Sequence, residues 1–295
     1  MKKNFVGIMP AIFSVYDENL NVIKPTVRKM VDYQLENGCT GFYVGGNTGE
    51  CTVLPAKTRK QMLEAVIEAN AGRGKIMAHI GAGHFDETMD LLAHANSLEG
   101  VDAVASLPPS LTGYYKMPNT VDYYRTLAEK SKTPVFAYIT GVLNGSPLDF
   151  ANLVASIPNV AGIKLTIPDY FTFGRVCAAH PEMNILNGPD ETMVCGLSMG
   201  ADGAIGTTYN FVPKLAVGIY EAFKAGKMDE AREKQQKLQS IIGAALGNGI
   251  SYWKAIMTIM GYDMGATVFP GKNPTAAEVA ELEAKLKTIG FFDVL

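Results

Sequence analysis

The chain has 295 residues, of which 47% are hydrophobic and 19% are charged, and its formal net charge is -3. This length and composition suit one large domain with a sizeable core. The near-neutral charge gives no electrostatic footprint for nucleic acid, and no apolar run approaches the ~20 residues that span a bilayer. We therefore expect neither a nucleic acid partner nor a membrane partner.

Cysteine and histidine residues show no metal-binding spacing. The four cysteines form no CxxC pair, and the four histidines form neither an HxxxH nor an HExxH pattern. We expect reduced structural thiols, a cytoplasmic protein and no metal site. The nucleotide motifs GxGxxG and GxxxxGK[ST] are missing as well, so no nucleotide cofactor is expected.

Apolar, β-rich runs recur eight times over the first 210 residues. They cover residues 7–13, 41–46, 75–81, 103–109, 135–140, 160–166, 184–189 and 203–210. The spacing leaves room for one helix after each strand, and the segments between the runs carry apolar residues at helical spacing. This alternation predicts an α/β fold of the (β/α)8 barrel type. An open doubly wound sheet shares the alternation, but its usual glycine-rich first turn is missing.

After Gly226 the pattern changes to helices alone. The first of them combines glutamate–lysine pairs at i,i+4 with an apolar stripe. Three helices are predicted, over residues 228–246, 250–261 and 275–288. We therefore expect a catalytic barrel over residues 1–226 and a helical extension over residues 227–295 that packs on the barrel.

Lys164 stands in the middle of the apolar segment 161–166, where lysine is rarely found without a reason. One interpretation is a lysine that snorkels to water or pairs with a carboxylate. The other is an amine nucleophile whose pKa is lowered by desolvation. Alternation along a strand puts Gly162, Lys164 and Thr166 on the same face.

Active sites of (β/α)8 barrels lie at the C-terminal ends of the strands, and several of the predicted strands end in polar residues. In residues 45–50 (GGNTGE), glycines and free N–H groups either grip a carboxylate or form a tight turn. Tyr138 is either a core residue or a proton shuttle. The acidic residues in 187–191 either cap the next helix or bind substrate hydroxyls. Residues 206–210 add small and hydroxyl-bearing side chains.

A lysine, a tyrosine and an anion-binding loop at successive strand ends fit class I imine chemistry. A free lysine has a pKa of about 10.4, and burial would lower this pKa and make the amine nucleophilic. The imine withdraws electrons from the neighbouring carbon, so that a C–C bond can break without a metal.

These features resemble the dihydrodipicolinate synthase/N-acetylneuraminate lyase family. The resemblance covers essentially the whole chain and is carried by Tyr138 and by residues 45–50, 162–166 and 200–206. It implies a (β/α)8 barrel, a homotetramer built as a dimer of dimers, and no cofactor beyond a covalent imine. The partners it implies are small molecules, namely pyruvate and a 2-keto acid substrate.

The resemblance also implies roles for individual residues. The implied catalytic residues are Lys164, Tyr138, Thr48 and Tyr114. Lys164 would form the Schiff base, Tyr138 would shuttle protons, and Tyr114, favoured over Tyr115, would reach across a dimer interface. The implied substrate-binding residues are Asn47, Thr48, Thr166, Gly188, Asp190, Glu191 and Thr207. Asn47 and Thr48 would hold the 2-keto carboxylate.

The residues after Tyr138 separate two branches of this family. The synthase branch usually has an arginine there for a second carboxylate, whereas residues 139–145 contain none. Residues 187–191 (NGPDE) and 206–210 (GTTYN) are close to motifs of the lyase branch. The resemblance therefore implies retro-aldol cleavage of N-acetylneuraminate to pyruvate and N-acetylmannosamine.

The chain departs from the lyase pattern at four positions. Asn47 and Thr207 replace serines and keep hydrogen-bonding capacity, whereas Gly141 and Pro189 could reshape the distal part of the pocket. The alternatives are an aldolase or dehydratase acting on another 2-keto sugar acid, a dihydrodipicolinate synthase-like enzyme, and a non-catalytic 2-keto acid sensor. Retention of both the lysine and the tyrosine argues against the sensor.

Overall fold

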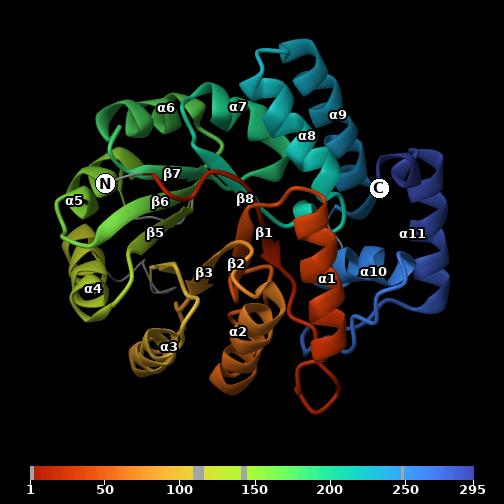
Figure 1. Cartoon of the computed structure of the whole chain (residues 1–295), viewed down its shortest axis with the longest axis horizontal. Helices are drawn as coiled ribbons and strands as arrows, with labels where there is room; N and C mark the ends of the chain where they lie inside the picture. The colour runs from red at the N-terminus through yellow and green to blue at the C-terminus, as the bar shows by residue number, and fades with distance from the viewer. Residues whose placement is uncertain (1–2, 109–115, 141–144, 247–248) are drawn as a thin grey trace.

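Eight parallel strands close into a barrel in the computed structural model, which describes residues 3–108, 116–140, 145–246 and 249–295 (Figure 1). Each strand pairs with its sequence neighbours, and β8 closes the barrel on β1. The strands are β1 (Gly7–Ile12), β2 (Gly41–Val44), β3 (Lys75–His79), β4 (Ala103–Ser106), β5 (Val135–Thr140), β6 (Val160–Thr166), β7 (Asn184–Asn187) and β8 (Gly203–Gly206). The predicted (β/α)8 barrel is confirmed.

One helix follows each strand and packs on the outside of the barrel. These helices are α1 (Lys24–Glu36), α2 (Ala56–Asn70), α3 (Phe85–Ser97), α4 (Met117–Lys130), α5 (Pro147–Ala155), α6 (Tyr170–Ala179), α7 (Met193–Ser198) and α8 (Pro213–Lys224). Val27, Met30 and Val31 of α1 are fully buried, as expected from an apolar stripe at helical spacing. The sequence period of each helix therefore decides which face meets the sheet.

Several strands are shorter than predicted. The run predicted over 41–46 is a strand only as far as Val44, and the run predicted over 203–210 ends as a strand at Gly206. Beyond them, the backbone turns at Gly45, whose φ is +76°, and forms a 3-10 turn over Thr208–Asn210. These extra residues lie at the C-terminal ends of the strands, where the sequence becomes polar, and they supply loops to the barrel mouth.

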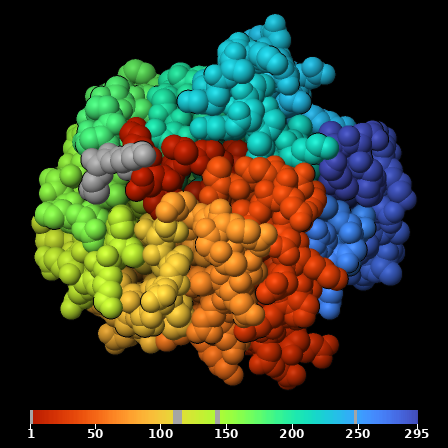
Figure 2. Space-filling view, viewed as in Figure 1, coloured from red at the N-terminus to blue at the C-terminus, as the bar shows by residue number. Residues whose placement is uncertain are grey.

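The barrel interior is filled by side chains from alternate strand positions, as the strand period requires. They form one cluster, which includes Met9, Tyr43, Met77, Ala105, Phe136, Tyr138, Leu186 and Ile205. At the N-terminal end of the barrel, the side chain of Asn184 bonds to the backbone N–H and C=O of Phe5 at 2.9 and 2.7 Å. Figure 2 shows the N-terminal segment lying across this face of the molecule. The N-terminal segment is thereby tied to this end of the barrel.

Three further helices complete the chain: α9 (Met228–Ala245), α10 (Ile250–Ile259) and α11 (Ala276–Thr288). Helix α9 packs beside α8, and α11 contacts both α9 and α10 (Figure 1, blue). The segment after α10 returns to the barrel, where the N–H of Ala266 donates to the carbonyl of Tyr16 at 2.8 Å. Among the described residues, no helix combines the length and the hydropathy needed to cross a membrane.

Candidate active site

Lys164 lies inside the barrel between two aromatic rings. Its side chain comes from β6, is paired in register with Tyr138 of β5, and is only 5% exposed. The Nζ atom is 4.5 Å from the centroid of the Tyr43 ring and 4.3 Å from that of Tyr138. Lys164 makes no ion pair with any described carboxylate, and its side chain stays inside the barrel between the two rings rather than extending to the surface. The interpretation of a snorkelling or carboxylate-paired lysine is therefore wrong.

Tyr43 and His79 complete the surroundings of this amine, and the sequence analysis missed both. The Tyr43 hydroxyl lies 2.8 Å from Nδ1 of His79, and the Tyr43 and Tyr138 rings meet edge to face at 6.3 Å. Burial raises the pKa of Tyr43 well above its usual value. Burial, and next the cations Arg59 and Lys164, hold the pKa of His79 well below its usual value. Both side chains are therefore neutral near pH 7.

The signal that identifies Tyr43 and His79 is the strand alternation that placed Lys164 inside. On β2 the residues next to Tyr43 belong to the outer core, whereas Tyr43 itself belongs to the inner cluster. His79 stands two positions after Met77, which is another inner residue. The register of β3, rather than the spacing of metal ligands, is therefore the signal that identifies His79.

The loops after β2 and β8, the two strands that flank β1, meet at the C-terminal end of the barrel. The hydroxyl of Thr48 lies 2.7 Å from that of Thr207, so two predicted site residues from opposite ends of the sequence are brought together. A Cβ on Gly46 would lie 2.3 Å from Cε1 of Tyr43, so only glycine fits there without displacement. The side chain of Asn47 is exposed, and its Oδ1 lies 3.4 Å from Sγ of Cys51.

Thr166 and Gly188 form a second close contact at the barrel mouth. A Cβ added to Gly188 would lie 1.7 Å from Oγ1 of Thr166, and the Gly188 N–H donates to the Leu165 carbonyl at 2.9 Å. Oγ1 of Thr166 is buried and has no hydrogen-bond partner among the described residues. The hydroxyl is thus left available at the same mouth as Lys164.

Asp190 joins the loops after β7 and β8. Its Oδ2 accepts hydrogen bonds from the backbone N–H and the hydroxyl of Thr208, both at 2.7 Å. Burial is the main reason why the pKa of Asp190 is raised to about 6. Helix α7 has no side-chain cap at its N-terminus, so the helix-capping interpretation is wrong for Asp190. Glu191, beside it, is exposed.

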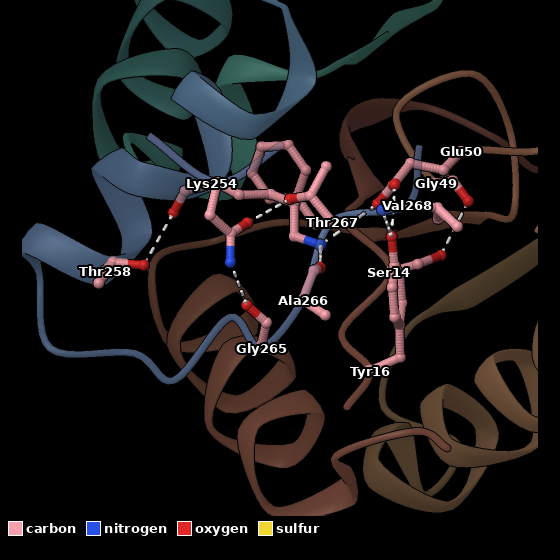
Figure 3. Close-up of polar contacts among 12 residues, drawn as sticks. Ser14, Tyr16, Gly49, Glu50, Lys254, Thr258, Gly265, Ala266, Thr267 and Val268 are labelled. Carbon is pink, nitrogen blue, oxygen red and sulfur yellow. Dashed lines mark hydrogen bonds and ion pairs between the residues drawn. The ribbon is translucent and has the colours of Figure 1, made fainter. Parts of the chain in front are cut away.

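The C-terminal helices brace the loops after β7 and β2, a feature with no signal in the sequence. From α9, Gln235 donates to the carbonyl of Asp190 at 3.1 Å and Gln239 donates to that of Glu191 at 2.7 Å. From α10, Lys254 pairs with Glu50 in the loop after β2 (Figure 3). The predicted residues Tyr114 and Gly141 lie outside the described part of the chain.

Two basic side chains, Arg59 and Lys164, are buried near this end of the barrel. Arg59 of α2 is 3% exposed and donates from Nη2 to the carbonyl of His79 at 2.9 Å. Within the described residues, neither Arg59 nor Lys164 makes an ion pair. Arg59 lies beside Val44, Ala78 and Leu91 of the outer core, between α2 and the barrel, so Lys164 is the one of the two that faces the barrel interior.

Comparison with known proteins finds a family model and sequence relatives that both cover most of this chain. The model of the dihydrodipicolinate synthetase family matches residues 4–289. An N-acetylneuraminate lyase of Rhizobium meliloti is 32% identical over 278 residues, which cover 94% of this chain and 92% of that protein. The Escherichia coli K12 protein of the same name is 32% identical over 267 residues, covering 89% and 88%.

Solved structures agree with these sequence relatives. N-acetylneuraminate lyase of Proteus mirabilis superposes with a TM-score of 0.91 at 27% identity and covers 97% of this chain and 99% of its own. Ruminococcus gnavus sialic acid aldolase superposes with a TM-score of 0.90 at 29% identity and covers 99% of both chains.

Proposed function

This chain belongs to the dihydrodipicolinate synthetase family and is an aldolase-type lyase, and we propose that it cleaves N-acetylneuraminate to pyruvate and N-acetylmannosamine through an imine on Lys164. The observation that carries this proposal is the buried amine of Lys164, which lies between the rings of Tyr43 and Tyr138 and has no ion-pair partner in the described part of the chain. The names of the relatives at 32% identity, N-acetylneuraminate lyases, support the choice of substrate.

Imine formation is the first chemical step. The free electron pair of Nζ of Lys164 attacks the C2 carbonyl of the open-chain substrate, and the carbinolamine takes a proton from the Tyr138 hydroxyl and loses water to give a protonated imine. The faces of Tyr43 and Tyr138 favour a positive charge at Nζ, which the imine carries. The Thr48 hydroxyl and the N–H groups of the loop after β2 would hold the adjacent carboxylate, with Asn47 at the rim.

Bond cleavage follows from the imine. Tyr138 takes the proton of the C4 hydroxyl, and the C3–C4 bond breaks so that C4 leaves as the aldehyde of N-acetylmannosamine. The electron pair of that bond flows toward the imine and gives an enamine. A proton returns to C3, and water hydrolyses the imine to release pyruvate and the free amine. No cofactor beyond this covalent imine is needed.

The sugar chain would extend over the loops after β6, β7 and β8. The side chains proposed to meet it there are Thr166, Asp190, Glu191 and Thr207, together with the backbone at Gly188. Tyr114 is proposed to act across a dimer interface in a cytoplasmic homotetramer. The close approach of Gly188 to Thr166 supports this assignment, because a side chain at 188 would occupy the space beside the hydroxyl.

Turnover of N-acetylneuraminate tests the proposal. We expect release of pyruvate in equal amount to N-acetylmannosamine, and loss of that release in Lys164→Met, which keeps the length of the side chain but removes the amine. Parallel reactions with other 2-keto sugar acids test the alternative substrates. These matter because Pro189, which stands in place of an aromatic or aliphatic residue, could reshape the distal part of the pocket. Inertness toward N-acetylneuraminate, with cleavage of another 2-keto sugar acid, would overturn the proposed substrate.

A further inference from the structure

A buried ion pair connects the C-terminal helices to the loop that carries Asn47 and Thr48. We infer that Lys254 of α10 is a positioning residue, which holds the carboxylate-binding loop in its binding geometry through Glu50; this inference rests on the proposed function. The C-terminal helices would then be part of the catalytic unit, although none of their residues lies beside Lys164.

The pair is closed off from solvent and fully partnered (Figure 3). Nζ of Lys254 lies 3.3 Å from Oε1 of Glu50, and both side chains are 3% exposed. The other carboxylate oxygen, Oε2, accepts from the Tyr16 hydroxyl at 2.6 Å. Lys254 also donates to the carbonyl of Ala266 at 2.9 Å, and its Nζ lies 4.4 Å from the centroid of the Tyr16 ring.

The backbone couples Glu50 to the two residues that would bind carboxylate. Glu50 has a φ of +62°, a left-handed conformation that residues with a Cβ seldom adopt. Its N–H donates to the carbonyl of Asn47 at 2.9 Å, which closes the turn around Thr48. Ser14 adds a hydrogen bond from its hydroxyl to the Gly49 carbonyl at 2.8 Å. A displaced Glu50 would therefore move Asn47 and Thr48 with it.

Stability alone is a poor explanation for this pair. Two buried charges lose their hydration, and well-packed apolar residues of similar volume often serve a fold as well or better. Burial lowers the pKa of Lys254, although Glu50 opposes that shift. Apolar contacts would not fix the orientation of the side chain at position 50. The Glu50 carboxylate accepts hydrogen bonds from Lys254 and Tyr16 at once, and so fixes the loop from two sides.

Three variants test the inference by reductive trapping on Lys164. Lys254→Met removes the charge, and Glu50→Gln combined with Lys254→Met removes the tie without leaving a buried charge. The matched control is Lys285→Met, which breaks an exposed pair with Glu281 on α11 (2.8 Å). Each protein is treated with borohydride and either pyruvate or acetone, a methyl ketone without a carboxylate, and the Lys164 adduct is quantified by mass spectrometry.

We expect the pyruvate concentration for half-maximal trapping to rise about tenfold or more in Lys254→Met and in the double variant. Acetone trapping should stay within about twofold of wild type, because acetone makes no carboxylate contact. The double variant should also melt near the wild-type temperature, since no unpaired charge stays buried. Lys285→Met should behave as wild type with both ketones.

Two outcomes would overturn the inference. One is wild-type pyruvate affinity in both variants. The other is an equal loss of pyruvate and acetone reactivity, which would mean that Lys254 supports only the folded state. A wild-type protein that traps no pyruvate would instead overturn the proposed function, so the two failures are distinguishable.

Discussion

Gly188→Ala tests the close packing at the end of β7. The new Cβ would lie 1.7 Å from Oγ1 of Thr166, 2.8 Å from its Cβ and 3.1 Å from its Cα. Rotation of the threonine side chain relieves only the first of these contacts, so the backbone of one loop must move. Overpacking of this kind costs about 1–3 kcal/mol. Because Thr166 stands two residues after Lys164, we expect kcat/KM for pyruvate release to fall about tenfold or more.

The assay combines steady-state pyruvate release with urea unfolding. The matched control is Gly243→Ala, an exposed position on α9 where an added Cβ meets nothing within 4 Å. Replacement of a helical glycine by alanine should raise the free energy of unfolding by about 1 kcal/mol and leave kcat/KM unchanged. Wild-type activity and stability in Gly188→Ala would refute the reasoning.

Two further variants address proton chemistry. The folded-state pKa of Asp190 is raised from 3.8 to about 6 by burial, so its contribution to stability is present below about pH 4 and lost as pH rises through 6. The free energy of unfolding of Asp190→Asn, measured from melting curves between pH 4 and 7.5, should therefore rise relative to that of wild type as the pH rises, by about 3 kcal/mol in total. A difference between the two proteins that does not change with pH would contradict this. Tyr138→Phe should slow cleavage about 10²–10⁴-fold, and a full-rate variant would remove the proton-shuttle role.

Two regular patterns in the sequence predict the main features of the fold. Apolar runs spaced by helical segments predicted the barrel, and alternation along β6 predicted that Lys164 and Thr166 share a face. The ends of the strands are less predictable. Segments 45–50 and 207–210 are short and consist mostly of small and polar residues, a composition that is compatible with either a longer strand or a turn. Their turns depend on contacts from far along the chain, such as that between Thr48 and Thr207.

The missed parts of the candidate site depend on tertiary structure. Alternation along β2 and β3 places Tyr43 and His79 inside the barrel, but their contacts with Lys164 and Tyr138 come from other strands and are not visible in the sequence. Lys254 gave no signal, because its partner Glu50 is 204 residues away in the sequence. For Asp190 the sequence left helix capping and substrate binding open, because acids are common at helix starts; its carboxylate accepts hydrogen bonds from Thr208 instead of capping the helix.

The most direct test of the central claim is the mass of the Lys164 peptide after treatment with pyruvate and borohydride. Reduction of the imine leaves the pyruvate carbons on Nζ through a stable C–N bond. We predict a single pyruvate-derived adduct on the peptide that contains Lys164, and no such adduct at that position in Lys164→Met. An unmodified Lys164 peptide, or a stoichiometric adduct on another lysine, would contradict the proposed mechanism.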